Sequence, residues 1–180
     1  SQFVTGLSSS TTYFYCAIAQ NSEGTAFGTV QTFTTLAAPT VTTQAATNVT
    51  GSSATLNGQG TPIGSAATGW FRHSTLNPVT CNDTFGTRTP VSGGTSLGAG
   101  TSAVNFIANV TGLSSGTTYY FCAIASNAVG TGVGTVQTFS TPGAPTVTTV
   151  APSGVSSSVA TLNGSADPRG SDTTGYFRFS

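Results

Sequence analysis

The sequence repeats itself at a fixed distance of 106 residues. Thr11 to Phe33 reads TTYFYCAIAQNSEGTAFGTVQTF, and Thr117 to Phe139 reads TTYYFCAIASNAVGTGVGTVQTF. Across Gly6–Thr35 and Gly112–Thr141, 21 of 30 positions are identical and no gap is needed. Solenoid and propeller repeats have periods of about 20–50 residues, so this longer period is typical of a whole domain. The sequence therefore predicts one unit copied head to tail.

The repeat divides the chain into three segments. Residues 1–37 are the tail of one unit, residues 38–143 a complete unit, and residues 144–180 the head of a third. We expect a window on a longer repetitive polymer. The alternative is that the head of one chain is completed by the tail of the next, as in strand complementation. It is less favoured, because the two partial segments together still lack the counterpart of Thr75–Phe106.

The chain is almost free of charge, which excludes two classes of partner. It has four arginines, four acidic residues and no lysine. Binding to nucleic acid needs clustered basic residues, and binding to a membrane surface needs a basic or amphipathic face. No apolar run approaches the roughly 20 residues that span a bilayer. We expect no nucleic-acid partner and no membrane insertion in this segment.

Short segments of alternating apolar and polar residues, separated by Gly, Ser, Asn and Pro, predict an all-β fold made of two packed antiparallel sheets. In the complete unit we expect strands at 40–43, 53–60, 68–74, 87–91, 102–110, 117–127 and 134–141. In the segment 117–127, alternation assigns one face to Tyr119, Phe121, Ala123 and Ala125. The other face carries Tyr120, Cys122, Ile124 and Ser126. One of these faces is the core.

The stretch GLSSGTTYYFCAIASNAVG, from Gly112 to Gly130, resembles the E–F corner and F strand of fibronectin type III domains. The family pattern falls on Leu113, Gly116, Thr117, Tyr119, Phe121, Ala123, Ala125, Asn127 and Gly130, with Ser115 in place of the usual turn proline. TVQTFST, APTVTT, ATLNG and GYFRFS are similar to other strands and junctions of bacterial members. The resemblance implies tandem immunoglobulin-like sandwiches, one complete and two partial.

The resemblance also implies roles for particular residues. Strands E, F and G are expected in residues 1–37, and strands A, B and C in residues 144–180. Tyr13 and Tyr119 would be tyrosine-corner residues, each phenol bonding to backbone upstream, the alternative being ordinary core aromatics. Function is not implied, because such modules serve as spacers, adhesive surfaces and binding scaffolds alike.

The three cysteines become interpretable through the repeat. Cys16 and Cys122 are equivalent, whereas Cys81 lies in a segment that neither partial copy includes. The simplest pairing is Cys81 with Cys122 within one unit, and the partner of Cys16 lies outside the sequence. The stretch NPVTCNDTFG is then expected to fold across the outer face of the sheet. The alternative is a cross-link between neighbouring units or filament subunits. A disulfide implies an oxidising compartment.

No enzymatic, metal or cofactor site is expected. His73 is the single histidine, and its counterpart in the third copy is Phe179, so we expect an ordinary, partly buried position. No Ser-His-Asp set, acidic pair or calcium loop recurs with the repeat. Sequons begin at Asn48, Asn82, Asn109 and Asn163, which makes glycans a candidate class of partner; the alternative is that these triplets arise by chance in a chain rich in Ser and Thr.

We expect a structural segment of an extracellular fibre, sheath or surface stalk, in which the protein's partner is itself. Aromatic residues of the outer sheet face are candidate assembly contacts, with cover beneath the disulfide loop as their alternative role; they are Trp70, Tyr120, Tyr176 and Phe14. Two other functions stay open. One is an adhesin or carbohydrate-binding module that uses a loop containing Asp83, Phe85 and Arg88. The other is a spacer beside a catalytic domain.

Overall fold

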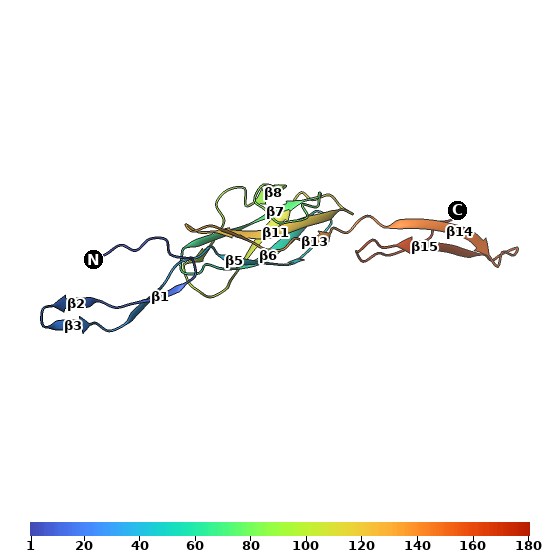
Figure 1. The fold of residues 1–180 in the computed structure, drawn as a ribbon. Coiled ribbons are helices and arrows are strands. Elements are labelled where there is room, and N and C mark those ends of the chain that lie inside the picture. The colour runs from blue at the N-terminus through green and yellow to red at the C-terminus, as the bar shows by residue number, and fades with distance from the viewer.

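The computed structural model describes residues 1–180, and every regular element in it is a β-strand. The molecule is elongated, with its termini at opposite ends and its thickest part in the middle (Figure 1). All strand pairs are antiparallel. The predicted all-β class is confirmed. Below, residues 1–37, 38–143 and 144–180 are called the N-terminal, central and C-terminal segments.

The central segment is a sandwich of two sheets. The first has the order β10-β6-β5, and the second has the order β12-β11-β7-β8, with β13 also paired to β11 and β9 to β7. The first sheet contains β5 (Thr40–Thr47), β6 (Ser53–Thr61) and β10 (Val104–Thr111). The second contains β7 (Ala67–Ser74), β8 (Thr87–Thr89), β9 (Thr95–Gly98), β11 (Thr118–Ser126), β12 (Thr131–Val133) and β13 (Gln137–Ser140).

The core lies between these sheets and follows the alternation of the sequence. Along β6 every second residue is buried, and β10 shows the same period. Successive side chains of a strand point to opposite faces, so a period of two turns one face of each sheet inward. One cluster of fourteen buried residues results, with Leu56, Phe71 and Phe121 fully enclosed. The predicted division of β11 holds, because Tyr119, Phe121, Ala123 and Ala125 all belong to this cluster.

The expected strand 134–141 forms only in part, as β13, and a further short strand, β12, lies just before its expected start. Both pair with the same edge of β11, but at Ala123 the ladder is interrupted. There the Ala123 N–H donates to Thr43 Oγ1 at 3.0 Å, and the Ala123 carbonyl accepts from the Gly134 N–H at 2.9 Å. A Cβ on Gly134 would lie 2.4 Å from Thr43 Oγ1, so glycine allows this close approach to β5. The break therefore ties the two sheets together.

Strand β9 was not expected. It lies in the stretch SGGTSLGAG, whose glycines and serines favour a loop on local propensity alone. Leu97 is the buried residue of this strand, and its side chain is only 4 % exposed. The strand forms because it pairs with β7 and buries Leu97, and the sequence of this stretch alone indicates neither interaction.

The N-terminal and C-terminal segments form hairpins, and each lacks a strand that was predicted. The N-terminal segment contains β1 (Thr12–Tyr15), β2 (Ile18–Asn21), β3 (Gly24–Phe27) and β4 (Gln31–Thr34), and the C-terminal segment contains β14 (Thr146–Ser153) and β15 (Thr161–Asp167). Strand E at the start of the chain and strand C at residues 174–180 do not form. In the central segment strand E (β10) pairs with strand B (β6), and strand C (β7) pairs with strand F (β11). Neither terminal segment contains the necessary partner.

The strands that do form repeat their register at 106 residues. Thr12 is opposite Thr34 just as Thr118 is opposite Ser140. In the same way β14 and β15 repeat the pairing of β5 and β6, including the irregularity in register. The hairpin ladders are therefore a local property of the repeated sequence, because they form with or without the rest of the sandwich.

Glycines on the inner sheet faces make room for aromatic rings, and this can be tested at Gly69. A Cβ on Gly69 would lie 2.9–3.1 Å from three ring atoms of Phe106, which is itself 3 % exposed. Overpacking of this kind costs about 1–3 kcal/mol. We predict that Gly69→Ala lowers the free energy of unfolding by this amount in urea titrations. The control is Gly100→Ala, where the nearest atom is 3.9 Å away, and an equal loss in both variants would contradict this packing.

Candidate functional site

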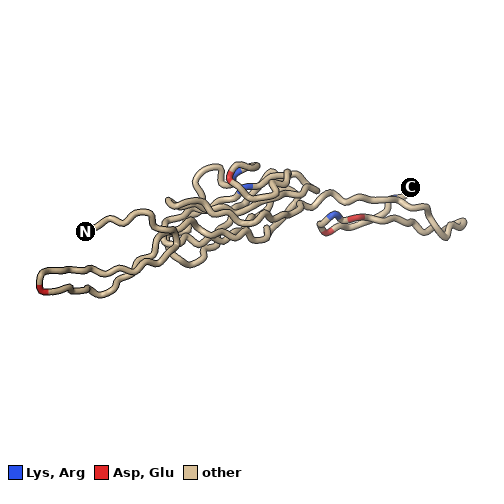
Figure 2. Tube along the Cα trace, in the orientation of Figure 1, with Lys and Arg blue, Asp and Glu red and all other residues tan.

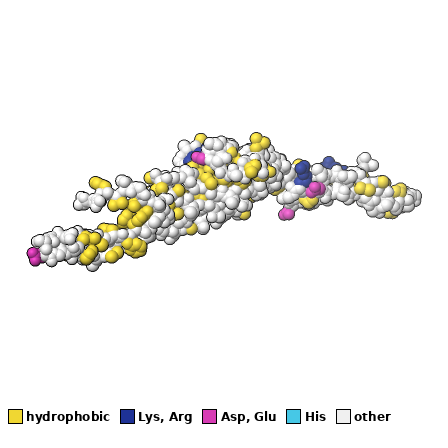
Figure 3. All heavy atoms as spheres, viewed as in Figure 1, with side chains coloured by type: hydrophobic (Ala, Val, Ile, Leu, Met, Phe, Trp, Pro, Cys, Tyr) yellow, Lys and Arg dark blue, Asp and Glu magenta, His cyan; other side chains and the backbone are white.

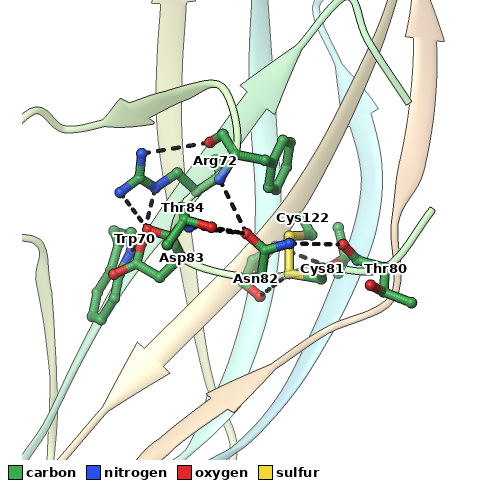
Figure 4. The surroundings of a disulfide bond; sticks show 11 residues. Trp70, Arg72, Thr80, Cys81, Asn82, Asp83, Thr84 and Cys122 are labelled. Atoms are coloured by element: carbon green, nitrogen blue, oxygen red, sulfur yellow. Dashed lines mark hydrogen bonds and ion pairs between the residues drawn. A yellow bond between two sulfur atoms is a disulfide. The ribbon is translucent and has the colours of Figure 1, made fainter. Parts of the chain in front are cut away.

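The outer face of the second sheet is covered by a loop, residues 75–86, which is held by a disulfide (Figure 4). Cys81 is bonded to Cys122, with their Cα atoms 6.0 Å apart. Beneath the loop lies a second apolar cluster of Trp70, Cys122 and Ile124, against which Cys81 and Phe85 pack. Strand β11 is thus buried on both faces. The disulfide pairing and the path of the loop are those expected within one unit.

Asn82 shapes the loop next to the disulfide. Its Oδ1 accepts hydrogen bonds from the backbone N–H groups of Thr84 and Phe85, at 3.0 and 3.1 Å, and from Thr84 Oγ1 at 2.7 Å. An asparagine that bonds to backbone two and three residues ahead closes a tight turn. This turn directs the Asp83 carboxylate back toward Trp70 and Arg72 of the sheet (Figure 4). It also brings Phe85 onto the second cluster.

Asp83 is the polar centre of the site. Its Oδ1 accepts from Trp70 Nε1 at 2.8 Å and from Arg72 Nε at 2.9 Å. Arg72 also donates to the Asp83 carbonyl at 2.6 Å and to the carbonyls of Phe85 and Gly86. Desolvation raises the pKa of Asp83, but the bonds from Arg72 and Trp70 and the charges of Arg72 and Arg88 outweigh it. The pKa of Asp83 therefore lies below its ordinary value.

Arg88 closes the site from β8. Its guanidinium carbon lies 4.6 Å from the centre of the Trp70 ring, within the range of a cation–π contact. The same guanidinium donates to the carbonyls of Pro90 and Gly93. The tryptophan is thus enclosed by a carboxylate at its N–H and a guanidinium above its face, and it is only 6 % exposed. The adhesin alternative needs Asp83, Phe85 and Arg88 to be free for a ligand, whereas here they are engaged with the sheet and with one another.

The four candidate contact aromatics lie in different surroundings. Trp70 is enclosed, which favours its alternative role as cover beneath the loop, and Tyr120 is half-buried. Phe14 and Tyr176 are 71 % and 75 % exposed, in the two terminal segments. Arg72, which binds Asp83 and the loop, is the site residue that the sequence analysis did not identify. Its signal was its place two residues after Trp70, which puts both side chains on the same face of β7.

The two predicted corner tyrosines have matching surroundings. Tyr119 Oη accepts from the Ser114 N–H at 2.9 Å, and Tyr13 Oη accepts from the Ser8 N–H at 2.9 Å. Each ring also stacks on a phenylalanine, Phe139 for Tyr119 and Phe33 for Tyr13. Both phenols therefore bond to backbone five residues upstream, as the tyrosine-corner interpretation requires.

The remaining candidates are isolated side chains. His73 is partly buried at the end of β7, its Nδ1 is 3.4 Å from Thr89 Oγ1, and burial lowers its pKa. Cys16 is a free, exposed cysteine.

No group of three or more His, Cys, Asp or Glu side chains is arranged to hold a metal ion. The structure contains no helix long and apolar enough to cross a membrane.

Fold and site together define an all-β protein with a disulfide-anchored loop on an antiparallel sandwich. No family model and no curated protein matches the chain. Three solved structures of the sensor domain of the anti-sigma factor RsgI4 in Pseudobacteroides cellulosolvens are similar to it. A longer version is 20 % identical, with a TM-score of 0.38, and the match covers 59 % of this chain and 91 % of that one.

A shorter version is 18 % identical, with a TM-score of 0.41, and the match covers 59 % of this chain and 96 % of that one. The solution structure is 20 % identical, with a TM-score of 0.36, over 56 % and 73 % of the two chains. Similarity of this degree indicates nothing beyond the all-β class that the strands themselves establish.

Removing the disulfide should destabilise the central segment. The bond closes a long stretch of chain, since the two cysteines are 41 residues apart, and loss of a native disulfide costs about 2–5 kcal/mol. We predict this decrease for the double variant Cys81→Ser with Cys122→Ser in urea unfolding. Cys16→Ser is the matched control, because Cys16 is exposed and unpaired, and it should unfold like the parent. Equal stability of all three proteins would contradict a structural role for the bond.

His73 should make stability depend on pH. Burial lowers its pKa below 6.5, so the unfolded state binds more protons than the native state as the pH falls below that value. The free energy of unfolding should therefore decrease between about pH 7.5 and pH 5, above the range in which carboxylates titrate. In His73→Phe, which introduces the residue found at the counterpart Phe179, this decrease should be absent. An unchanged slope in the variant would assign the effect elsewhere.

Proposed function

We propose that the chain is a segment of tandem fibronectin type III-like modules with a structural, non-catalytic role outside the cell. The central segment, residues 38–143, is one complete module. Residues 1–37 are the last part of a preceding module, and residues 144–180 are the first part of a following one. In this role the modules form a fibre, sheath or surface stalk. The observation that carries the proposal is the recurrence of the same ladders and the same tyrosine corner 106 residues apart.

The junctions between the segments support a stiff rod. At the C-terminal junction the Gly116 N–H donates to the Pro142 carbonyl at 3.1 Å, and the Gly143 N–H donates to the Arg169 carbonyl at 3.0 Å. A short linker that contains proline and is hydrogen-bonded on both sides has little freedom to bend. Successive modules therefore keep a fixed direction, in agreement with the extended arrangement of the segments (Figure 1).

The two junctions also share their packing. Gly170 faces Pro142 at the C-terminal junction, and its counterpart Gly64 faces Leu36, the counterpart of Pro142, at the N-terminal junction. Both glycines have positive φ values, 89° and 82°, which favour glycine. The same turn thus contacts the same linker position twice. This repetition supports a regular series in which each module is placed on the previous one in the same way.

The disulfide and the low surface charge support an extracellular location of the protein. A buried disulfide is formed and retained in oxidising compartments. Only 4 % of the residues are charged, and Figure 2 shows most of them at three places: the β2–β3 turn, the disulfide loop with the strands beside it, and the end of β15. A surface of this kind presents little charge repulsion to neighbouring molecules. It is suited to lateral packing of rods.

The proposal is tested by locating the protein on the organism that makes it. Antibodies raised against the central segment should label fibres, sheath or surface layer of intact, unpermeabilised cells in immunogold electron micrographs. Protease added to the same cells should remove the label. A cytoplasmic enzyme, stained before and after permeabilisation, is the control for cell integrity. Label found only inside permeabilised cells would refute the proposal.

A further inference from the structure

One edge of the central sandwich is long, regular and unprotected. Strand β10 forms an edge of the first sheet, where it pairs with β6 alone. Its eight residues pair without irregularity, and none of them is charged or a proline. On the side away from β6, the backbone N–H and C=O groups of every second residue have no hydrogen-bond partner in the protein. Such an edge is a template for a further strand.

The other edge strands of the central segment are short or irregular. Strands β8 and β12 have three residues each, and β9 and β13 have four each. Strand β5 is as long as β10, but its register with β6 shifts between Gln44 and Thr47, and Thr43 Oγ1 ties it to the second sheet. Edges of this kind offer few backbone groups to another chain. Strand β10 is therefore the edge at which this segment can accept a further strand.

The sequence of β10 is its own complement in an antiparallel pair. Residues 104–110 read VNFIANV, so that in both directions from Ile107 an asparagine stands two residues away and a valine three residues away. Two copies placed antiparallel with their Ile107 residues opposite one another therefore put asparagine against asparagine and valine against valine. Such a pair has a twofold axis, and each contact is made twice. A second copy of the chain is thus the occupant that matches this edge.

The side chains on the outer face of β10 are ready for this contact. Ile107 is 59 % exposed and is the only exposed large apolar residue on the strands of the first sheet. Beside it, Asn105 Oδ1 accepts from Gln59 Nε2 and Asn109 Oδ1 accepts from Thr55 Oγ1, both at 2.9 Å. The two asparagine Nδ2 groups have no partner in the protein. In the pair, each Nδ2 group can donate to the Oδ1 of the opposite asparagine, and each Ile107 is covered by the other.

Charge does not oppose the approach of two such edges. The central segment has three charged residues, Arg72, Asp83 and Arg88, and all of them belong to the second sheet or to the disulfide loop. On the face of the central segment seen in Figure 3, charged side chains appear only near that loop. Natural edge strands are commonly protected by charged side chains, lysine above all, and the first sheet has none.

We propose that β10 pairs antiparallel with β10 of a second copy, with Ile107 opposite Ile107, and joins two three-stranded sheets into one continuous sheet. On the inner face Phe106 lies opposite Ala108 of the second copy, so that a large side chain meets a small one. The strands of the central segment run roughly along the long axis of the molecule (Figure 1), so two rods lie side by side in opposite directions. This deepens the proposed function and rests on it, because it names one lateral contact between rods.

The contact belongs to this unit rather than to every unit of the series. The counterparts of Ile107 and Asn109 in the preceding unit are Ser1 and Phe3, so the self-complementary pattern is not repeated. A single pair of strands also makes a small interface, and small interfaces are weak. The dimer should therefore dissociate on dilution.

The first test is association of the 180-residue chain, measured by sedimentation velocity over a range of concentrations. All proteins carry Cys16→Ser, which removes the free thiol. The parent should show a monomer–dimer equilibrium. Ile107→Lys should raise the dissociation constant of the dimer at least about tenfold, because two like charges then lie directly opposite one another. An unchanged near-ultraviolet circular dichroism spectrum confirms that the variant is folded.

Val129→Lys is the matched control. Val129 is 46 % exposed and lies in the turn between β11 and β12, at the other edge of the sandwich. This variant should dimerise like the parent. A parent that is monomeric at every concentration, or an Ile107→Lys variant that associates as tightly as the parent, would overturn the pairing. Either result would leave the extracellular role standing, because cell labelling tests that role separately.

The second test fixes the register. Residues directly opposite in antiparallel strands have Cα atoms about 4.5–5.5 Å apart, within the span of a disulfide. Asn105→Cys and Asn109→Cys, both made with Cys16→Ser, place thiols opposite one another only when a copy of each kind is paired. Under mild oxidation the mixture should therefore give cross-linked dimers on non-reducing gels, and each variant by itself should stay monomeric. Equal cross-linking of a single variant and the mixture, or no cross-linking in the mixture, would contradict the register.

Discussion

Strand β11 is the element on which the rest of this structure depends, because both of its faces are buried. One face carries Tyr119 and Phe121 into the core between the sheets, and the other carries Cys122 and Ile124 beneath the disulfide loop. A strand that is buried on both faces needs a covering layer on each face. In a sandwich of two sheets, the opposite sheet covers only the inner face. The loop of residues 75–86 supplies the other. The disulfide, the Asp83 network and the enclosed Trp70 all follow from this requirement.

A comparison of the terminal segments with the central segment shows which parts of the fold depend on local sequence and which depend on tertiary contacts. The β1–β4 and β2–β3 ladders form in the same register as their counterparts, and the Tyr13 phenol makes the same backbone bond as Tyr119. These features need only residues close in sequence. Strands E and C are missing where their partner strands are missing. The same sequence therefore forms its hairpins by itself, whereas its core forms only where the complementary strands are present.

The sequence allowed most of the central fold and part of the site to be predicted. Alternation gave the two faces of β11, and the cysteine pairing and loop path followed from the repeat. Strand β9 was missed because its glycines and serines carry no strand signal, and the division of β12 from β13 depends on a cross-sheet bond to Thr43. The bonds from Trp70 and Arg72 to Asp83 were also missed. They join residues 11 and 13 positions apart through a turn whose shape no local pattern describes.

The sequence by itself determined the repeat length, the all-β class, the hairpin registers and the alternation of inner and outer residues, since each depends on residues near one another in the chain. Tertiary structure decided which outward residues are enclosed. Trp70 and Tyr176 occupy equivalent positions, yet Trp70 is 6 % exposed and Tyr176 is 75 % exposed. The difference arises because burial requires a covering layer, and that layer comes from chain distant in sequence that only the central segment contains.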